Sequence, residues 1–199
     1  MEILHLNAGQ LQTNCYVVWA EGSTTCAVID PGDEAERILR TIEGRGLTVE
    51  AILLTHGHFD HVGAVKDICK ATGCKVYMNI KELALPENLT AGPLQYTDHY
   101  AGTVTAGGLT FTVLETPGHS EGSVCLVCGN VIFSGDTLFA GTCGRTDLPT
   151  GSWNTILTSL KTLACLPGDY TVYPGHGPAT TMKDERAYNP YMTAYGTDA

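Results

Sequence analysis

A short histidine-rich segment, Thr55-His56-Gly57-His58-Phe59-Asp60-His61, constrains this sequence more than any other feature. The segment directly follows Val49 and the apolar run at residues 51–54, which are typical of a strand in a sheet covered on both faces. In α/β sheets the C-terminal end of such a strand is where ligands bind. His56 and His58 are two residues apart, so both can point toward one ion, and Asp60 and His61 can face a second. A solvated polar loop rarely has this spacing, and the segment therefore predicts a metal site.

Two of the remaining histidines stand in a second recurring context, a strand that ends in Pro-Gly-His. His119 follows an alternating strand at residues 109–116, and His176 follows a short predicted strand at residues 171–173. In each turn proline fixes φ and glycine allows the backbone to approach closely. Asp136 occupies a similar place after the apolar residues 131–133. Five histidines and two aspartates therefore follow four predicted strands.

These motifs resemble those of the metallo-β-lactamase superfamily. Residues 55–61 match the family's T-H-x-H-x-D-H motif without a gap, and His119, Asp136 and His176 match its later motifs. Asp30, in Ala27-Val28-Ile29-Asp30-Pro31-Gly32, matches the aspartate that closes an early strand. The resemblance implies an α+β fold, a four-layer αββα sandwich with two mixed sheets packed face to face and helices outside. It places the site at the edge of the sandwich, between the sheets.

Within the superfamily, the sequence is most similar to the short glyoxalase II-like branch. Residues 135–139 and Gly144-Arg145-Thr146-Asp147 resemble a segment shared by glyoxalase II-like proteins and persulfide dioxygenases, and residues 184–190 resemble the tail of the short branch. Full-length glyoxalase II has a C-terminal helical domain that supplies much of its glutathione-binding surface, whereas here residues 177–199 follow the last histidine motif. We therefore expect one metallo-β-lactamase-like domain over residues 1–199, without that helical domain.

The resemblance also assigns metal ligands. It implies two divalent ions, one held by His56, His58 and His119, the other by Asp60, His61 and His176, with Asp136 bridging them. Zinc is the first expectation for such an imidazole-rich site, with iron or manganese as alternatives. Such ions supply a bridging hydroxide at neutral pH, and Asp60 is the expected catalytic residue that orients it.

Three charged residues near the motifs have supporting roles in this interpretation. Asp30 is expected to accept the free N–H of a ligand imidazole, although a turn residue capping Pro31-Gly32 explains it equally well. Arg145 and Asp147 are expected to pair and brace the loop under the site, in preference to touching substrate. His5 and His99 lie outside every motif and are expected at the surface or at a sheet edge. Tyr96, Tyr100, Tyr188 and Tyr191 are candidates for a pocket mouth, but their spacing gives no support.

Composition limits the partners and the location of the protein. A chain of 199 residues with 43% hydrophobic content can bury a sizeable core. Its 11 basic and 21 acidic residues give a net charge of −10, and no cluster of Lys and Arg is visible, so nucleic acid is not an expected partner. No segment predicts a membrane span or a signal peptide, so we expect a cytoplasmic protein that acts on a small molecule.

The eight cysteines have no disulfide framework spacing and are interpreted as small buried apolar residues. Cys125 and Cys128 form a C-x-x-C pattern, but positions three apart in a strand point to opposite faces. Cys143 is interpreted as a packing residue rather than a nucleophile, because the expected metal site already supplies one.

Hydrophobic patterning agrees with the sandwich. Strands are predicted at residues 2–6, 14–19, 25–29, 51–54 and 75–78, followed by a connector at residues 86–100. A first helix should begin after Asp33, capped by its carboxylate with Glu36 at the N3 position. A second should begin at about His61 and bury Val62, Val65, Ile68 and Cys69. A third should bury the stripe Ile156, Leu157, Leu160, Leu163 and Ala164.

Together these features predict a metal-dependent hydrolase, first of all a thioesterase. The substrate class expected from the resemblance is S-D-lactoylglutathione or the thioester of another low-molecular-weight thiol. A mononuclear iron persulfide dioxygenase is the main alternative. Lactonase and β-lactamase activities have less support, and Asp136 further disfavours the β-lactamases that have Cys at this position. A non-enzymatic binding protein would not need all seven ligand residues.

Overall fold

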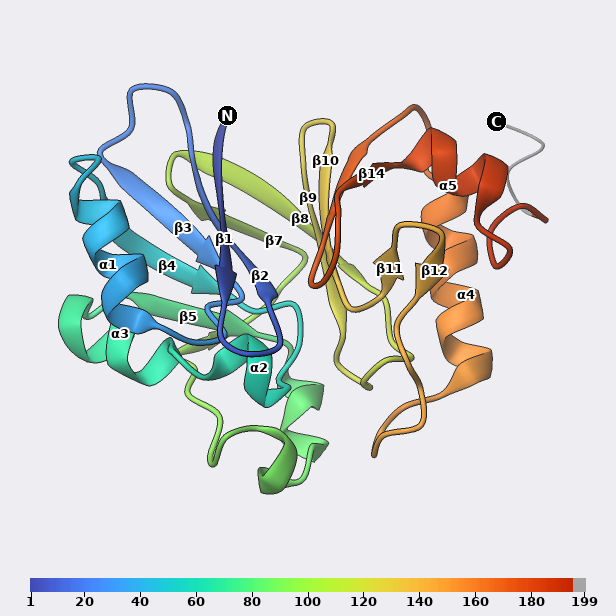
Figure 1. Cartoon of the computed structure of the whole chain (residues 1–199), viewed down its shortest axis with the longest axis horizontal. Helices are drawn as coiled ribbons and strands as arrows, with labels where there is room; N and C mark the ends of the chain where they lie inside the picture. The colour runs from blue at the N-terminus through green and yellow to red at the C-terminus, as the bar shows by residue number, and fades with distance from the viewer. Residues whose placement is uncertain (195–199) are drawn as a thin grey trace.

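The computed structural model describes residues 1–194 as a four-layer sandwich, which confirms the predicted fold (Figure 1). The first sheet has the strand order β1-β2-β3-β4-β5-β6 and the second β14-β13-β10-β9-β8-β7. Both sheets are mixed, because β3, β4, β5 and β6 run parallel in the first and β10 pairs parallel with β13 in the second. Within residues 1–194, no helix has both the length and the apolar character needed to cross a bilayer.

The strands lie close to the predicted positions. The first sheet contains β1 (Glu2–Ala8), β2 (Thr13–Trp19), β3 (Thr25–Ile29), β4 (Thr48–Leu53), β5 (Lys75–Met78) and β6 (Asp98–His99). The second contains β7 (Thr103–Ala106), β8 (Leu109–Glu115), β9 (Val124–Cys128), β10 (Val131–Gly135), β13 (Thr171–Pro174) and β14 (Thr180–Thr181), and a small hairpin is formed by β11 (Leu138–Phe139) and β12 (Thr142–Cys143). His5 and His99 lie on β1 and β6, the two edge strands of the first sheet, as expected.

Helices cover the outer faces of both sheets (Figure 1). The α-helices are α1 (Ala35–Glu43), α2 (Phe59–Val62), α3 (Val65–Thr72), α4 (Trp153–Ala164) and α5 (Met182–Tyr188), and short 3₁₀ turns occupy Ile80–Ala84 and Glu87–Leu89. Three apolar clusters separate the layers. Ile38 and Ile52 belong to the cluster under α1 and α3, Phe111 and Phe133 to the cluster between the sheets, and Leu160 to the cluster under α4 and α5.

The cysteines behave largely as small packing residues. Cys125 belongs to the cluster under α4, whereas Cys128 belongs to the cluster between the sheets, so the two face opposite sides of β9 as predicted. Cys143 is half-buried and packs against the cluster that contains Cys125. Cys165 differs from the expectation, because it is exposed just after α4.

Two local predictions at the helix starts were wrong. Helix α1 has Glu34 at its N-cap in the left-handed region, and Asp33 instead accepts a hydrogen bond from the Glu34 N–H, so the predicted capping box does not form. The predicted second helix is divided into α2 and α3. The Ala64 N–H donates to the Pro31 carbonyl, and Gly63 lies so close to Gly32 O that a Cβ would collide. A contact between distant segments therefore interrupts the helix.

Candidate metal centre

The candidate centre lies where four strands end at one edge of the sandwich. His56, His58, Asp60 and His61 follow β4 of the first sheet, while His119, Asp136 and His176 follow β8, β10 and β13 of the second. The structure thus brings together all seven residues that the sequence indicated. Gly175 permits this approach, because a Cβ at that position would collide with Asp136 Oδ1 and His61 Cε1.

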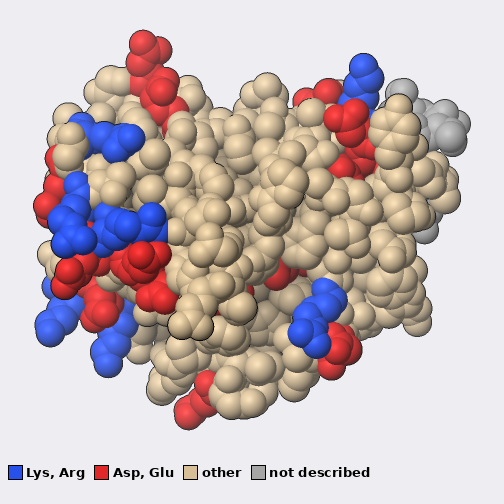
Figure 2. Space-filling model, viewed as in Figure 1, with Lys and Arg blue, Asp and Glu red and all other residues tan. Residues whose placement is uncertain are grey.

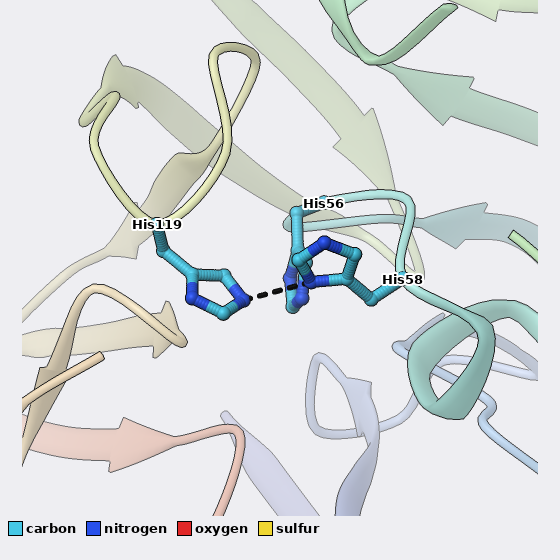
Figure 3. Close-up of side chains that lie close together, drawn as sticks. All are labelled: His56, His58 and His119. Carbon is cyan, nitrogen blue, oxygen red and sulfur yellow. Dashed lines mark hydrogen bonds between the residues drawn. The ribbon is translucent and has the colours of Figure 1, made fainter. Parts of the chain in front are cut away.

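Three imidazoles form the first group of potential ligands. In Figure 3 the rings of His56, His58 and His119 point toward one another from two separate loops. His58 Nδ1 lies 2.8 Å from His119 Nε2, and all three residues are buried. Each residue offers one nitrogen within 4.8 Å of the others, a separation that allows a shared cation.

Asp60, His61 and His176 form the second group, and Asp136 lies between the two groups. His176 Nε2 is 3.1 Å from Asp60 Oδ2, and His61 Nε2 is 3.7 Å from the same oxygen. The two oxygens of Asp136 face different histidines, with Oδ1 at 3.4 Å from His61 Nε2 and Oδ2 at 3.6 Å from His119 Nε2. This is the placement that a carboxylate shared by two ions would need.

Several buried polar atoms in the centre have no hydrogen-bond partner among the described residues. They are His56 Nε2, His58 Nε2, His61 Nε2 and Asp136 Oδ1. A buried polar atom without a partner is costly, and native proteins satisfy nearly all such atoms. The neutral imidazoles and the carboxylate are the donors that Zn²⁺, Fe²⁺ and Mn²⁺ accept, so this donor set fits divalent metal ions.

The two groups differ in their titration. Burial lowers the pKa of His56 well below its ordinary value, lowers the pKa of His58 to about 4, and also lowers the pKa of His119. These imidazoles are therefore neutral at pH 7, the form that binds metal. Burial would also lower the pKa of His61 and of His176, but Asp136 and Asp60 respectively reverse its effect and raise both.

The carboxylates respond in the opposite direction. Burial alone would raise the pKa of Asp60 and of Asp136. A hydrogen bond with His176 and the nearby charge of His61 nevertheless hold the pKa of Asp60 well below its usual range, and the charge of His61 lowers that of Asp136. In the absence of metal the second group is thus an ion-pair network, and metal binding there would release protons.

Hydrogen bonds outside the seven residues hold the centre in place. The carboxylate of Asp30 accepts from Thr55 N and Thr55 Oγ1 and lies 3.0 Å from His61 Nδ1, the contact expected for a residue that orients a ligand imidazole. The Arg145 carbonyl lies 2.8 Å from His119 Nδ1 and can accept its N–H. Both contacts leave the other ring nitrogen directed toward the centre.

Arg145 and Asp147 form the predicted pair, with two hydrogen bonds of 2.7 and 2.8 Å. Both side chains are mostly exposed, so the pair contributes little to stability. The support to the site comes instead from the Arg145 carbonyl, which the sequence did not indicate.

Sequence reasoning missed several residues that support the ligands. Thr13 Oγ1 donates to Asp60 Oδ2 at 3.2 Å, and Asn14 Nδ2 donates to the carbonyls of Pro174 and Gly177 on either side of His176. Glu82 is buried and accepts hydrogen bonds from the loops that carry His56, His58 and His119. These residues lie outside every motif, so no local signal could have identified them.

The tail motif, in contrast, was visible in the sequence and now has a structural role. Glu185 accepts from the Gly141 N–H with both carboxylate oxygens, and Asn189 Nδ2 donates to the Thr142 carbonyl. The Arg186 guanidinium donates to three carbonyls, one at the end of α4 and two in the segment just after it. The tail therefore anchors the β11–β12 hairpin, which follows Asp136.

A cavity of about 490 Å³ opens onto the centre and is bordered by apolar side chains. Its lining includes Leu11, Phe59, Leu89, Phe139 and Leu148, together with Arg145 and the candidate ligands His58, Asp60, His119, Asp136 and His176. None of the four tyrosines suggested from the sequence borders it. Tyr100 donates to the Leu54 carbonyl, and Tyr191 packs against Trp153.

Comparison with known proteins agrees with this geometry. The family model of the metallo-beta-lactamase superfamily matches residues 8–176. The hydroxyacylglutathione hydrolase GloC of Haemophilus influenzae is 34% identical and aligns over 98% of both chains. Among solved structures, the BLEG-1 B3 metallo-β-lactamase superposes with a TM-score of 0.88 at 34% identity, covering 96% of this chain and 100% of its own.

The di-iron-bound form of TTHA1623 superposes with a TM-score of 0.84 at 40% identity, covering 94% of this chain and 99% of its own. The family match extends over most of the sequence and includes every candidate ligand. The chain therefore belongs to the metallo-β-lactamase superfamily and is a metal-dependent hydrolase of that superfamily.

Proposed function

We propose that this protein is a binuclear thioesterase that cleaves S-D-lactoylglutathione, or a related thioester of a low-molecular-weight thiol, to a hydroxy acid and a free thiol. The observation that carries the proposal is the pair of ligand groups on either side of Asp136, at the wall of one cavity. The full-length similarity to the hydroxyacylglutathione hydrolase GloC supports the substrate class.

In this proposal, His56, His58 and His119 would hold one ion, Asp60, His61 and His176 would hold the other, and Asp136 would be shared between them. Seven ligands are too many for one tetrahedral or octahedral ion, which favours two. Zinc suits the imidazole-rich set, and iron or manganese would also be accepted. When bound, such ions act as Lewis acids and lower the pKa of water from 15.7 toward about 7, which supplies a nucleophile at neutral pH.

Asp60 is the proposed catalytic residue. Its pKa is held below the usual range, so it is a carboxylate at neutral pH and can accept a hydrogen bond from the attacking water at Oδ2. Thr13 Oγ1 and His176 Nε2 hold that oxygen from two sides, at 3.2 and 3.1 Å. The side chain is 15% exposed and borders the cavity, so water and substrate can reach it.

A thioester suits this cavity because its leaving group needs little help. A thiol has a pKa of about 8.5, so the thiolate can leave without protonation. An amine leaving group, in contrast, needs a general acid. The described residues that line the cavity include no Lys, Tyr or Cys that would serve as a general acid. Arg145, with a pKa raised by its hydrogen bonds to Asp147, stays protonated.

The second ligand group favours the proposal over an iron-dependent persulfide dioxygenase, although both classes of enzyme can retain the full motif, so metal count and oxygen uptake are the measurements that separate them. A mononuclear iron site would use one group and leave Asp60, His61 and His176 without a role, although Thr13 and Asp30 hold the first two in place. A lactone could be attacked by the same machinery, so lactonase activity is a test outcome and not a separate proposal.

The test is a panel of thioester, lactone, β-lactam and persulfide substrates, assayed with purified protein loaded with zinc, manganese or iron. We expect the highest kcat/KM for a 2-hydroxyacyl thioester. Asp136→Ala, purified in parallel, should lose the activity and so exclude a contaminating esterase. Sulfide- or persulfide-dependent oxygen uptake without thioester cleavage would reject the proposal.

A further inference from the structure

Glu82 is a buried carboxylate that neither the metal ligands nor the proposed reaction uses. It lies in the short 3₁₀ turn Ile80–Ala84, and the residue is 1% exposed. Among residues 1–194, no Lys or Arg side chain pairs with it, and its hydrogen-bond partners there are one side chain and two backbone N–H groups. A buried charge of this kind is costly unless its oxygens are well satisfied, so its partners indicate what it does.

The partners of Glu82 come from the two loops that supply the first ligand group. Oε2 accepts from the N–H of Gly57, the residue between His56 and His58. Oε1 accepts from Ser120 Oγ at 2.7 Å and from the N–H of Gly122 at 2.8 Å, in the loop that begins with His119. One carboxylate therefore connects a loop of the first sheet to a loop of the second.

The fit around the carboxylate is close on both sides. A Cβ on Gly122 would lie 2.6 Å from Glu82 Oε1, and a Cβ on Gly57 would lie 3.1 Å from Oε2. One further hydrogen bond joins the two segments, because the Val124 N–H donates to the Thr55 carbonyl at 2.9 Å. The loops can therefore move little relative to each other while Glu82 is in place.

We propose that Glu82 is a positioning residue that fixes the separation between the His56–His58 loop and His119, and so sets the affinity of the first ligand group for its metal ion. The inference rests on the proposed binuclear centre. The described hydrogen bonds of Glu82 include none to Asp60, His61 or His176, and the first two of these lie on α2, beyond the bonded residue Gly57, so the second group should depend little on Glu82.

The carboxylate form is needed because donors converge on both oxygens. Glutamine has nearly the same shape but only one acceptor oxygen. Whichever way its amide is oriented, the NH₂ group faces the N–H of Gly57 or that of Gly122. Glu82→Gln therefore opposes one of the two loops, while Ser120→Ala removes a single donor and keeps the carboxylate.

The experiment is a zinc titration against a competing chelator, at neutral pH, for the wild-type protein and variants. Glu82→Gln should lower the affinity for one of the two zinc ions by about tenfold or more, as for other residues that orient ligands indirectly. The affinity for the other ion should be unchanged. Ser120→Ala should lower the affinity for the affected ion by less. Glu121→Gln, an exposed neighbour with the same change of charge, is the matched control and should bind both ions normally.

A double-mutant cycle identifies which ion is affected. In a His176→Ala background, Glu82→Gln should still lower the affinity for the remaining zinc ion. In a His119→Ala background, the same substitution should not change the zinc affinity. Unfolding in excess chelator shows whether each variant is folded, and Ser120→Ala keeps the test decisive if Glu82→Gln is not. The positioning role is overturned if Glu82→Gln lowers the affinity for both ions equally. It is also overturned if neither Glu82→Gln nor Ser120→Ala changes the zinc affinity. A wild-type protein that binds fewer than two ions contradicts the proposed centre itself and this inference with it.

Discussion

Asp30 Oδ2 lies 3.0 Å from His61 Nδ1, and both side chains are almost fully buried. The same carboxylate accepts two hydrogen bonds from Thr55, immediately before His56. The contact orients the His61 ring so that Nε2 faces Asp60 and Asp136. Asp30 therefore joins the first motif of the sequence to the ligand segment of residues 55–61.

Asp30→Asn should weaken metal binding while the protein stays folded. The asparagine amide has one acceptor oxygen where the carboxylate has two, so either His61 or Thr55 loses its acceptor. We expect a loss of about 10- to 100-fold in metal affinity, greatest for the ion held by His61. Chelator competition measures it, and affinity unchanged from wild type would show that Asp30 serves only the turn at Pro31-Gly32.

Asp136→Ala should reduce metal content more than Asp60→Ala, because Asp136 faces both ligand groups and Asp60 faces one. Elemental analysis after dialysis against a fixed free-zinc concentration compares the two variants. Both should lose most of their activity, since the proposed mechanism uses both carboxylates. Two retained metals and near-normal turnover in Asp136→Ala would show that the bridging assignment is wrong.

The metal-free protein should lose stability as the pH falls from about 6.5 toward 4. Burial lowers the pKa of His58 from 6.5 to about 4, so in this window the unfolded chain binds a proton that the folded chain does not. Linkage gives roughly 3 kcal/mol of lost stability from this residue. His56 and His119 are shifted in the same direction.

The raised pKa values of His61 and His176 act at higher pH. Their contribution is fully present below about pH 6.5 and is lost as the pH rises through their folded-state values. Stability in chelator should therefore be greatest near pH 6.5. Urea unfolding at several pH values tests this, with His58→Asn as the control that should show a shallower acid slope. An acid slope identical to wild type in that variant would contradict the assignment.

The preference for glutathione as the thiol carrier should be modest. Arg145 is the one Lys or Arg side chain among the described residues that border the cavity, and Asp147 already pairs with it. Little binding energy from an anionic carrier is then available for transition-state positioning. We expect S-D-lactoylglutathione to exceed the same acyl group on a smaller thiol by less than about a thousandfold in kcat/KM, some 4 kcal/mol. A larger ratio would indicate a dedicated glutathione site.

The fold and the location of the centre could be predicted from the sequence because their signals are local. A strand pattern followed by His-x-His-x-Asp-His, or by Pro-Gly-His, predicts the strand itself. It also predicts the edge of the sheet at which the histidine side chain lies. The order of strands within each sheet brings these ends together. The pairing of Arg145 with Asp147 was also predictable, because the two residues are two positions apart.

Features that depend on contacts between distant segments could not be predicted. The interruption between α2 and α3 results from Pro31 and Gly32, about 30 residues earlier in the chain. Glu82 and Thr13 have no neighbours in sequence that suggest a role, and their partners lie 25 or more positions away. The capping box predicted at Asp33 does not form, because Glu34 adopts a left-handed conformation at the N-cap. The Glu34 carboxylate accepts hydrogen bonds from Arg37 and from the Gly9 N–H.

The most direct test of the proposed function is the source of the oxygen in the product. Metal-loaded protein is incubated with S-D-lactoylglutathione in ¹⁸O-labelled water under anaerobic conditions, and the products are analysed by mass spectrometry. Hydrolysis predicts one ¹⁸O atom in the product carboxylate and one free thiol per turnover, at the same rate with or without dioxygen. No turnover without dioxygen, together with oxygen consumption on a persulfide by protein containing one iron, would contradict the account.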